Sequence, residues 1–328
     1  MPNRGDKTLG RFALGRLVNS IPLVLGVIVV NFLLVSFAPG DPVTALIGDF
    51  PAPPEYVERV REQFGLDQPV HERLVRYVVN VARGDLGFSF ANRLPVLDLV
   101  LERLGRTLVL MIVTVTFATT VGVALGVMAA RKPHSAADAA ATGIALAGYS
   151  IPVFWLGQIL VIVFAVWLGL FPAGGMRSVR VTYTGLAALL DRARHMVLPM
   201  FALSFRYIAI TTRLTRSSLL EVMNSDYILA ARARGISERR VLWEHGLRAA
   251  ALPIITVIGY SFAFIVAGSA LVETVFGWPG VGRLMYDSIF TRDYPVMLGI
   301  LLVVSLSVIV VNLLTDIAYA LFDPRVRY

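Results

Sequence analysis

The chain has 328 residues, of which 56% are hydrophobic and 16% are charged, and its mean hydropathy is +0.71. This composition excludes an ordinary soluble globular domain and predicts a protein embedded in lipid. The net charge of +8 does not indicate a nucleic-acid partner, because the arginines lie beside apolar runs instead of forming one basic face. Cysteine is absent, which excludes disulfides, thiolate metal sites and a cysteine nucleophile.

Several apolar segments are long enough to cross a bilayer, which requires about 20 mostly apolar residues. Five of them are unambiguous: 17–38, 104–130, 196–214, 253–275 and 296–321. The segment 138–170 is either one long helix or two helices broken near Pro152. The first segment is too long for the apolar part of a signal peptide and has no small-residue cleavage site, so we expect a retained anchor.

The positions of arginine and lysine predict the orientation, because cytoplasmic loops carry an excess of both near the ends of spans. Six spans place both termini, the turn at Arg131 and Lys132 and the segment 213–248 in the cytoplasm. Seven spans would put that arginine-rich segment outside. We therefore expect an all-α integral membrane protein with about six transmembrane helices, in which 138–170 is one span. Its small-residue portion at 139–148 is expected to be interfacial or packed against protein.

The segment 39–103 is the only sizeable insert between spans, and six spans place it outside the cytoplasm. Pro51, Pro53 and Pro54 interrupt the chain there, and the apolar spacing at 55–64 predicts a short helix packed on the outer mouth. A structural role for this cap is favoured over direct contact with a ligand.

The sequence carries no catalytic motif. It has no phosphate-binding G-x-x-x-x-G-K-[ST] loop, no H-E-x-x-H and no G-x-S-x-G. Its four histidines stand at no metal-ligand spacing from one another, so we expect no metal site. The chain alone is therefore not expected to hydrolyse ATP or to act as an enzyme.

The segment 221–252, between the fourth and fifth spans, predicts a helix-turn-helix. Four residues before the turn suit a first helix: Tyr227, Ala230, Ala231 and Arg234. Gly235 suits the C′ position of that helix with a left-handed backbone, and Ser237 suits the N-cap of a second helix. The second helix has an apolar stripe of Val241, Leu242 and Leu247. Such a segment could insert in a partner's groove as a rigid lever or lie on anionic lipid headgroups, and the residues favour both equally.

The run from Ala230 to Gly235, continuing to Pro253, resembles the EAA loop of ABC importer permeases, which docks on the cytoplasmic ATPase subunit. Leu229 stands where that family has Glu, and the interval to Pro253 is longer than in the general motif. The longer interval is similar to the oligopeptide and dipeptide branch of the family. Further segments resemble the same branch in order along the chain: 38–42, 64–69, 84–89, 150–157, 213–218, 273–280, 292–295 and 323–325.

The resemblance implies the B-type permease subunit of a peptide importer, with the transmembrane fold of a type I ABC importer, as one permease domain over 1–328. It implies a channel-forming subunit that imports short peptides by alternating access in a bacterial plasma (inner) membrane. The implied partners are a paralogous permease, two ABC ATPase subunits that carry ATP and Mg, and an extracytoplasmic substrate-binding protein; no cofactor is expected on this chain. The implied docking residues are Asp226, Tyr227, Ala230, Ala231, Arg232, Arg234, Gly235 and Ser237.

Two alternatives to peptide import remain. The same branch includes permeases for nickel chelates, glutathione and other small solutes. A stand-alone secondary transporter is disfavoured, because it has no use for an ATPase-docking lever.

Among the charged residues within predicted spans, Arg206 and Glu273 are the candidates for the translocation path. Arg206 costs about 2.5–3.5 kcal/mol at that depth unless it finds water or a partner. It either lines a hydrated cavity on the translocation path, or snorkels or pairs structurally. Glu273 has the same two interpretations, on the translocation path or in a structural role. A pairing between Arg206 and Glu273 is a further alternative. Nearby, the run from Gly277 to Gly280 is expected to form a turn that ends the fifth span and holds Trp278 at the headgroups.

Overall fold

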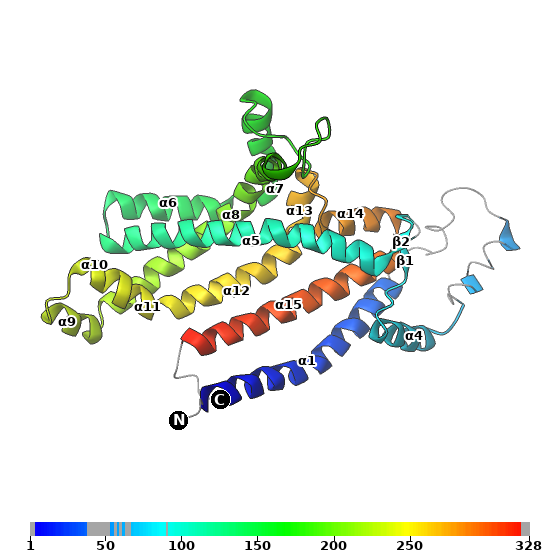
Figure 1. Cartoon of the computed structure of the whole chain (residues 1–328), viewed down its shortest axis with the longest axis horizontal. Coiled ribbons are helices and arrows are strands. Elements are labelled where there is room, and N and C mark those ends of the chain that lie inside the picture. The colour runs from blue at the N-terminus through cyan, green and yellow to red at the C-terminus, as the bar shows by residue number, and fades with distance from the viewer. Residues whose placement is uncertain are drawn as a thin grey trace.

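The computed structural model describes residues 4–37, 53–55, 58, 61–62, 67–89 and 91–322. In this part of the chain the only strands are β1 (Phe88–Ser89) and β2 (Leu94–Pro95), which pair antiparallel, and the other regular elements are helices. Figure 1 shows the long helices lying alongside one another, with their axes roughly along the longest dimension of the molecule. The predicted all-α class is confirmed.

Within the described residues, four helices are long and apolar enough to cross a membrane: α1 (Arg4–Ser36), α5 (Val96–Arg131), α8 (Gly185–Met223) and α15 (Tyr294–Phe322). Two pairs of shorter helices qualify if each bent pair counts as one span. The first pair is α6 (Ala136–Ser150) with α7 (Val153–Leu160) and the π-helical η1 (Val161–Trp167). The second joins α10 (Glu238–Arg240), η2 (Val241–Gly246) and α11 (Leu247–Ala249) to α12 (Ala251–Gly268). The described residues then hold up to six spans, in agreement with the prediction.

The segment 138–170 is broken at Pro152, so one straight helix is the wrong alternative. The helix axis bends by 103° between the two halves. Proline disfavours a helical conformation in the residue before it, and Ile151 is extended with φ −83° and ψ 125°. The portion 139–148 belongs to α6, which packs along α8 and α5. Of the two alternatives, interfacial or packed against protein, the second is confirmed.

Small residues bring α5 and α8 into close contact. A Cβ atom placed on Gly122 would lie 2.6 Å from Cβ of Thr211, and one placed on Gly126 would lie 2.6 Å from Cβ of Thr215. Glycines four residues apart lie on one face of a helix and let a neighbouring backbone approach. Any larger side chain at either glycine would force this central pair of helices apart.

The predicted fifth span, 253–275, is divided at Ser269 into α12 and α13 (Ala270–Val275). A turn then leads to α14 (Val281–Thr291), a short helix before α15. The break places α13 against α14 and α7, and α14 packs on α5 and α15.

The two ends of the bundle carry different elements (Figure 1). One end holds the start of α1, the turn between α5 and α6, α9 (Asp226–Ala233) and the end of α15. The other holds α4 (Val70–Ala82), the β1–β2 hairpin and α14. Six spans predict the same grouping, although which end faces the cytoplasm stays a prediction. Because α5 begins at Val96, the predicted insert 39–103 ends within this helix, and the expected helix at 55–64 lies largely outside the described residues.

Candidate coupling and translocation sites

The first helix of the predicted docking loop ends at Gly235, as the sequence indicates. Gly235 has a φ of +77°, and its N–H donates to the carbonyl of Arg232 at 2.9 Å. The N–H of Ile236 donates to the carbonyl of Ala231 at 3.4 Å. These two bonds form a Schellman motif, which satisfies the last carbonyls of α9 and requires a left-handed residue at C′. The predicted left-handed backbone at Gly235 is confirmed.

The second helix of the loop begins after Ser237, which occupies the N-cap position with φ −61° and ψ 143°. Its side chain makes no capping hydrogen bond, and instead its carbonyl accepts from the N–H of Val241 at 2.9 Å. The helix widens into the π-helical turn η2, which buries Val241, Leu242 and Gly246. The sequence pattern predicts an apolar stripe there but gives no signal for the π geometry.

The docking loop packs firmly on the ends of two long helices. Ile228, Ala231 and Val241 are buried together and contact the C-terminal end of α8. Leu242 packs in a second cluster with Leu219 of α8 and with the C-terminal end of α5. Displacement of the loop must therefore move α5 and α8 with it or break these two apolar clusters.

Most of the predicted docking residues are exposed on α9 and the turn. These are Asp226, Tyr227, Ala230, Arg232, Arg234, Gly235 and Ser237. Ala231 is the exception, because it is only 5% exposed and faces the cluster beneath the loop. Leu229, which replaces the family's Glu, is 65% exposed. The loop thus presents a mixed apolar and polar face outward and an apolar face inward.

Polar contacts fix the shape of this loop. Nε of Arg232 donates to Oε1 of Glu238 at 2.8 Å, which joins α9 to α10 across the turn. The hydroxyl of Tyr227 lies 2.7 Å from Nδ1 of His245. In the part of the chain that the structure describes, no carboxylate pairs with Arg234. Arg234 is therefore an exposed cation on this face of the loop.

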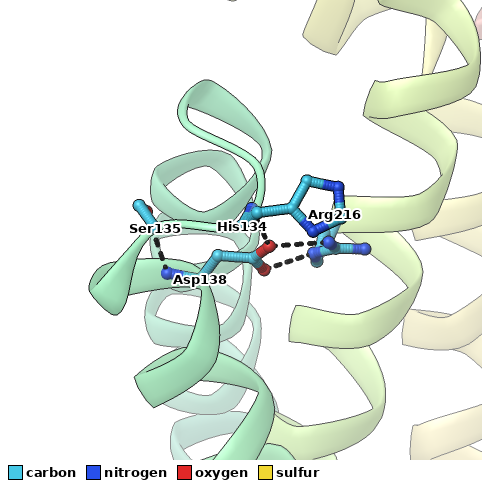
Figure 2. A network of polar contacts seen from close by, with 4 residues as sticks. All are labelled: His134, Ser135, Asp138 and Arg216. Atoms are coloured by element: carbon cyan, nitrogen blue, oxygen red, sulfur yellow. Dashed lines mark hydrogen bonds and ion pairs between the residues drawn. The ribbon is translucent and has the colours of Figure 1, made fainter.

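An ion pair near the docking loop joins the α5–α6 turn to α8 (Figure 2). Nε and Nη2 of Arg216 donate to the two carboxylate oxygens of Asp138 at 2.5 and 2.7 Å. The N–H of His134 also donates to Asp138, and the hydroxyl of Ser135 accepts from the N–H of Asp138 as the N-cap of α6. The Asp138 side chain is 6% exposed, so its charge depends on these partners. The sequence pattern gives no signal for the ion pair, although Ser135 and Asp138 have the spacing of a capping box.

Arg206 lines a cavity of about 490 Å³ at the bend between α6 and α7. It lies near the middle of α8, and its guanidinium lies 5.3 Å from the ring centre of Tyr149. Tyr207, Arg213 and Tyr260 also line the cavity. The position agrees with the cavity interpretation of Arg206, whereas its place on the translocation path stays a prediction.

Glu273 is fully buried and lies in a different environment from Arg206. Its carboxylate accepts from the hydroxyl of Thr107 at 2.7 Å, from the hydroxyl of Ser269 at 3.1 Å and from the N–H of Arg283 at 2.9 Å. Arg283 lies in the first turn of α14, where a negative charge interacts favourably with the helix dipole. None of these partners is Arg206, so the suggested pairing between the two charges is wrong. These contacts give Glu273 a role in joining α13 and α14 to α5.

The turn after Glu273 forms as predicted, and Trp278 within it is buried in protein. Gly277 has a φ of +59°, which supplies the turn. Trp278 is 0% exposed, and its indole N–H donates to the carbonyl of Arg106 at 3.2 Å. This side chain therefore faces the protein core where α5 meets the turn and does not face lipid headgroups, whereas the position of the turn at the outer interface stays a prediction.

Asp293 joins the β1–β2 hairpin to the start of α15. Its carboxylate accepts from the hydroxyl of Ser89 at 2.6 Å and from the N–H of Val296 at 3.4 Å. Burial raises the pKa of the Asp293 carboxyl, and the hydrogen bond from Ser89 opposes that increase. At the opposite end of α15, Asp316 pairs with Arg16 of α1 at 3.2 Å, which joins these two helices.

Comparison with known proteins assigns the fold to a family. Residues 122–328 match the family described as "binding-protein-dependent transport system inner membrane component". Residues 9–111 match the family that represents the N-terminal part of such membrane components. An inward-facing structure of the MetNI methionine ABC transporter superposes with a TM-score of 0.55, over 69% of this chain and 96% of the other. The two sequences are 18% identical, so this likeness shows the fold alone.

Three curated relatives are each 39% identical to this chain. The oligopeptide transport system permease protein AppB of Bacillus subtilis (strain 168) aligns over 98% of this chain and 100% of its own length. The dipeptide permease DppB and the glutathione permease GsiC of Escherichia coli (strain K12) each align over 97% of this chain and 99% of their own lengths. The chain therefore belongs to the family of binding-protein-dependent transport inner membrane components, the multi-pass permease subunits of ABC importers.

Proposed function

We propose that the chain is the channel-forming subunit of an ATP-driven importer of short peptides, and that it works with a paralogous permease. The relatives are described as oligopeptide, dipeptide and glutathione permeases, and all three substrates contain peptide chains with free carboxylates. An importer of a nickel chelate or another small solute is the alternative. The orientation that accompanies this proposal places both termini and the loop 221–252 in the bacterial cytoplasm.

The packing of the docking loop is the observation that carries the mechanism. Its inward face packs on α5 and α8, and its outward face is exposed, as a surface that docks on an ATPase subunit requires. On this proposal, two ATPase subunits bind ATP and Mg and move the docked loops when they close. The long helices then move as levers, and the paired permeases alternate between inward-open and outward-open cavities. The binding protein delivers substrate at the end that carries α4 and α14.

Replacing Gly235 with valine tests this proposal. A Cβ atom on Gly235 would meet no atom within 4 Å, so the replacement acts through the backbone and not through a clash. A left-handed conformation costs an ordinary residue about 1–2 kcal/mol, and a β-branched residue suffers most. Gly235→Val should therefore shift α9 relative to α10 while the protein still inserts. Gly235→Asn is the matched control, because asparagine tolerates this conformation.

The measurements are co-purification of the ATPase subunits and substrate-stimulated ATP hydrolysis in reconstituted complexes. We expect both to fall at least several-fold in Gly235→Val and to stay near wild type in Gly235→Asn. Wild-type values for both variants, with a change only in affinity for anionic lipid, would make the loop a membrane-surface anchor. Peptide uptake that persists without any ATPase subunit would favour a secondary transporter instead.

A further inference from the structure

The cavity at the bend between α6 and α7 has the chemistry of an anion site. Its polar lining includes Arg206 and Arg213 from α8, Tyr149 from α6 and Tyr260 from α12. None of the residues that line it is an aspartate or a glutamate. The cavity therefore contains two cations and several phenol groups, and no lining carboxylate neutralises them.

Arg206 is available to a ligand within this cavity. Its side chain is exposed, and its guanidinium lies over the face of the Tyr149 ring, 5.3 Å from the ring centre. Among the described residues, no carboxylate forms an ion pair with Arg206 or Arg213. Stacking on an aromatic ring leaves the N–H groups at the edge of a guanidinium free to donate. A charge at this depth is costly unless it faces water or an anion, which requires the cavity to be hydrated.

The shape of the lining favours a carboxylate attached to an organic solute over an inorganic anion. Pro152, Val153, Leu156 and Ile210 contribute an apolar wall beside the arginines. A guanidinium forms two parallel hydrogen bonds with a carboxylate, which fixes the direction of the bound group. The apolar wall then accepts the adjoining side chain of the solute. The volume of about 490 Å³ is within the usual range for small-molecule sites.

We propose that this cavity binds a carboxylate of the transported solute and that Arg206 is the residue that receives it. The inference rests on the proposed function and adds a selective contact within the membrane to it. The chemical requirement is a free carboxylate next to an apolar or aromatic group, as at the C-terminus of a short peptide. Tyr149 positions the guanidinium by stacking, and the bend at Pro152 creates the space.

A transport assay with a matched pair of solutes tests the proposal. The complete complex with its binding protein is reconstituted in proteoliposomes, and uptake of glycyl-phenylalanine is compared with uptake of its C-terminal amide. The binding protein has its own preference between the two, but that preference is identical for every permease variant. The change in the uptake ratio between wild type and variant therefore reports the membrane cavity alone.

We expect Arg206→Gln to lower uptake of the free dipeptide about tenfold or more and to change uptake of the amide less than about twofold. This difference corresponds to one charge-assisted hydrogen-bonded pair. Arg206→Lys keeps the charge but cannot donate two parallel hydrogen bonds to a carboxylate. Its ratio of dipeptide to amide uptake should therefore lie between those of wild type and Arg206→Gln. Equal loss of both solutes would show that Arg206 is structural, and unchanged uptake of both would also overturn the proposal.

A second measurement does not depend on transport. Phenylglyoxal modifies accessible arginine side chains, and mass spectrometry of the purified complex reports the modified fraction of Arg206. The free dipeptide should reduce this fraction at least several-fold, whereas its amide should not. Equal protection by both, or by neither, would overturn the carboxylate site. If wild type transports neither solute but the protection is selective, the proposed peptide cargo fails and the carboxylate site stands.

Discussion

Replacing Gly280 with alanine should destabilise the protein far more than the addition of one methyl group usually does. The backbone of Gly280 is ordinary, with a φ of −97°, so alanine meets no conformational penalty there. The space is the problem, because an added methyl group would overlap the carboxylate of Glu273 and the hydroxyl of Thr107. Those two groups are hydrogen-bonded to each other and are both 0% exposed, so neither can move into solvent.

The magnitude follows from two contributions. Overpacking a well-filled site costs about 1–3 kcal/mol. Displacing the Glu273 carboxylate from one of its donors leaves buried polar groups unsatisfied, which costs a further 1–3 kcal/mol or so. The total of about 2–6 kcal/mol is a large part of the roughly 5–15 kcal/mol that stabilises an ordinary domain. We expect the apparent Tm to fall by at least about 4 °C.

Thermal unfolding of the purified protein, followed by tryptophan fluorescence, measures this effect because Trp278 is buried beside the altered turn. Gly105→Ala is the matched control, since a Cβ atom there would meet nothing within 4 Å and the residue lies within α5. Alanine is favoured over glycine in a helix by about 0.5–1 kcal/mol, so the control should melt at the wild-type temperature or slightly above it. Equal Tm values for Gly280→Ala and wild type would refute the assignment of Glu273 as a packed structural carboxylate.

Two other predictions concern topology and the ion pair near the docking loop. In this cysteine-free chain, single cysteines at Asp67 and at Val179, which is 97% exposed, should be labelled from one side of the membrane, and a cysteine at Arg239 from the other. Labelling of all three from one side would disprove the six-span orientation. Arg216→Gln should lower the apparent Tm by several degrees, because it leaves the buried Asp138 carboxylate without its cation, and Arg216→Lys should lower it less. Equal losses in the two variants would mean that the charge of Arg216 contributes little.

Features determined by neighbouring residues were predictable from the sequence. The end of α9 at Gly235 depends on a conformation that glycine adopts freely, and the break at Pro152 depends on one steric clash with the preceding residue. Span number and position follow from the length of apolar runs, because a helix satisfies its own backbone in lipid. Each of these signals lies within one short segment of the chain.

Features formed between distant segments were not predictable in the same way. Asp138 and Arg216 are 78 residues apart, and Thr107 and Glu273 are 166 apart. A single sequence shows that such charges must find partners, but it does not identify the partners. Trp278 illustrates the same limit, because an aromatic next to a turn suits the headgroup region and a buried site equally until its neighbours are known.

The same contacts suggest how the docking loop would reach the proposed carboxylate site. The loop is packed on the end of α8, and Arg206 lies further along this same helix. The ion pair to Asp138 fixes the start of α6 to α8, so Tyr149 and Arg206 should move together. The remaining wall of the cavity includes Tyr260 on α12, which packs mainly against α15 and bends by 55° where it joins the loop. Movement of the loop would therefore change the separation between α12 and the α6–α8 pair. The cavity lies between these elements, so it would open or close around a bound carboxylate on the side of α12.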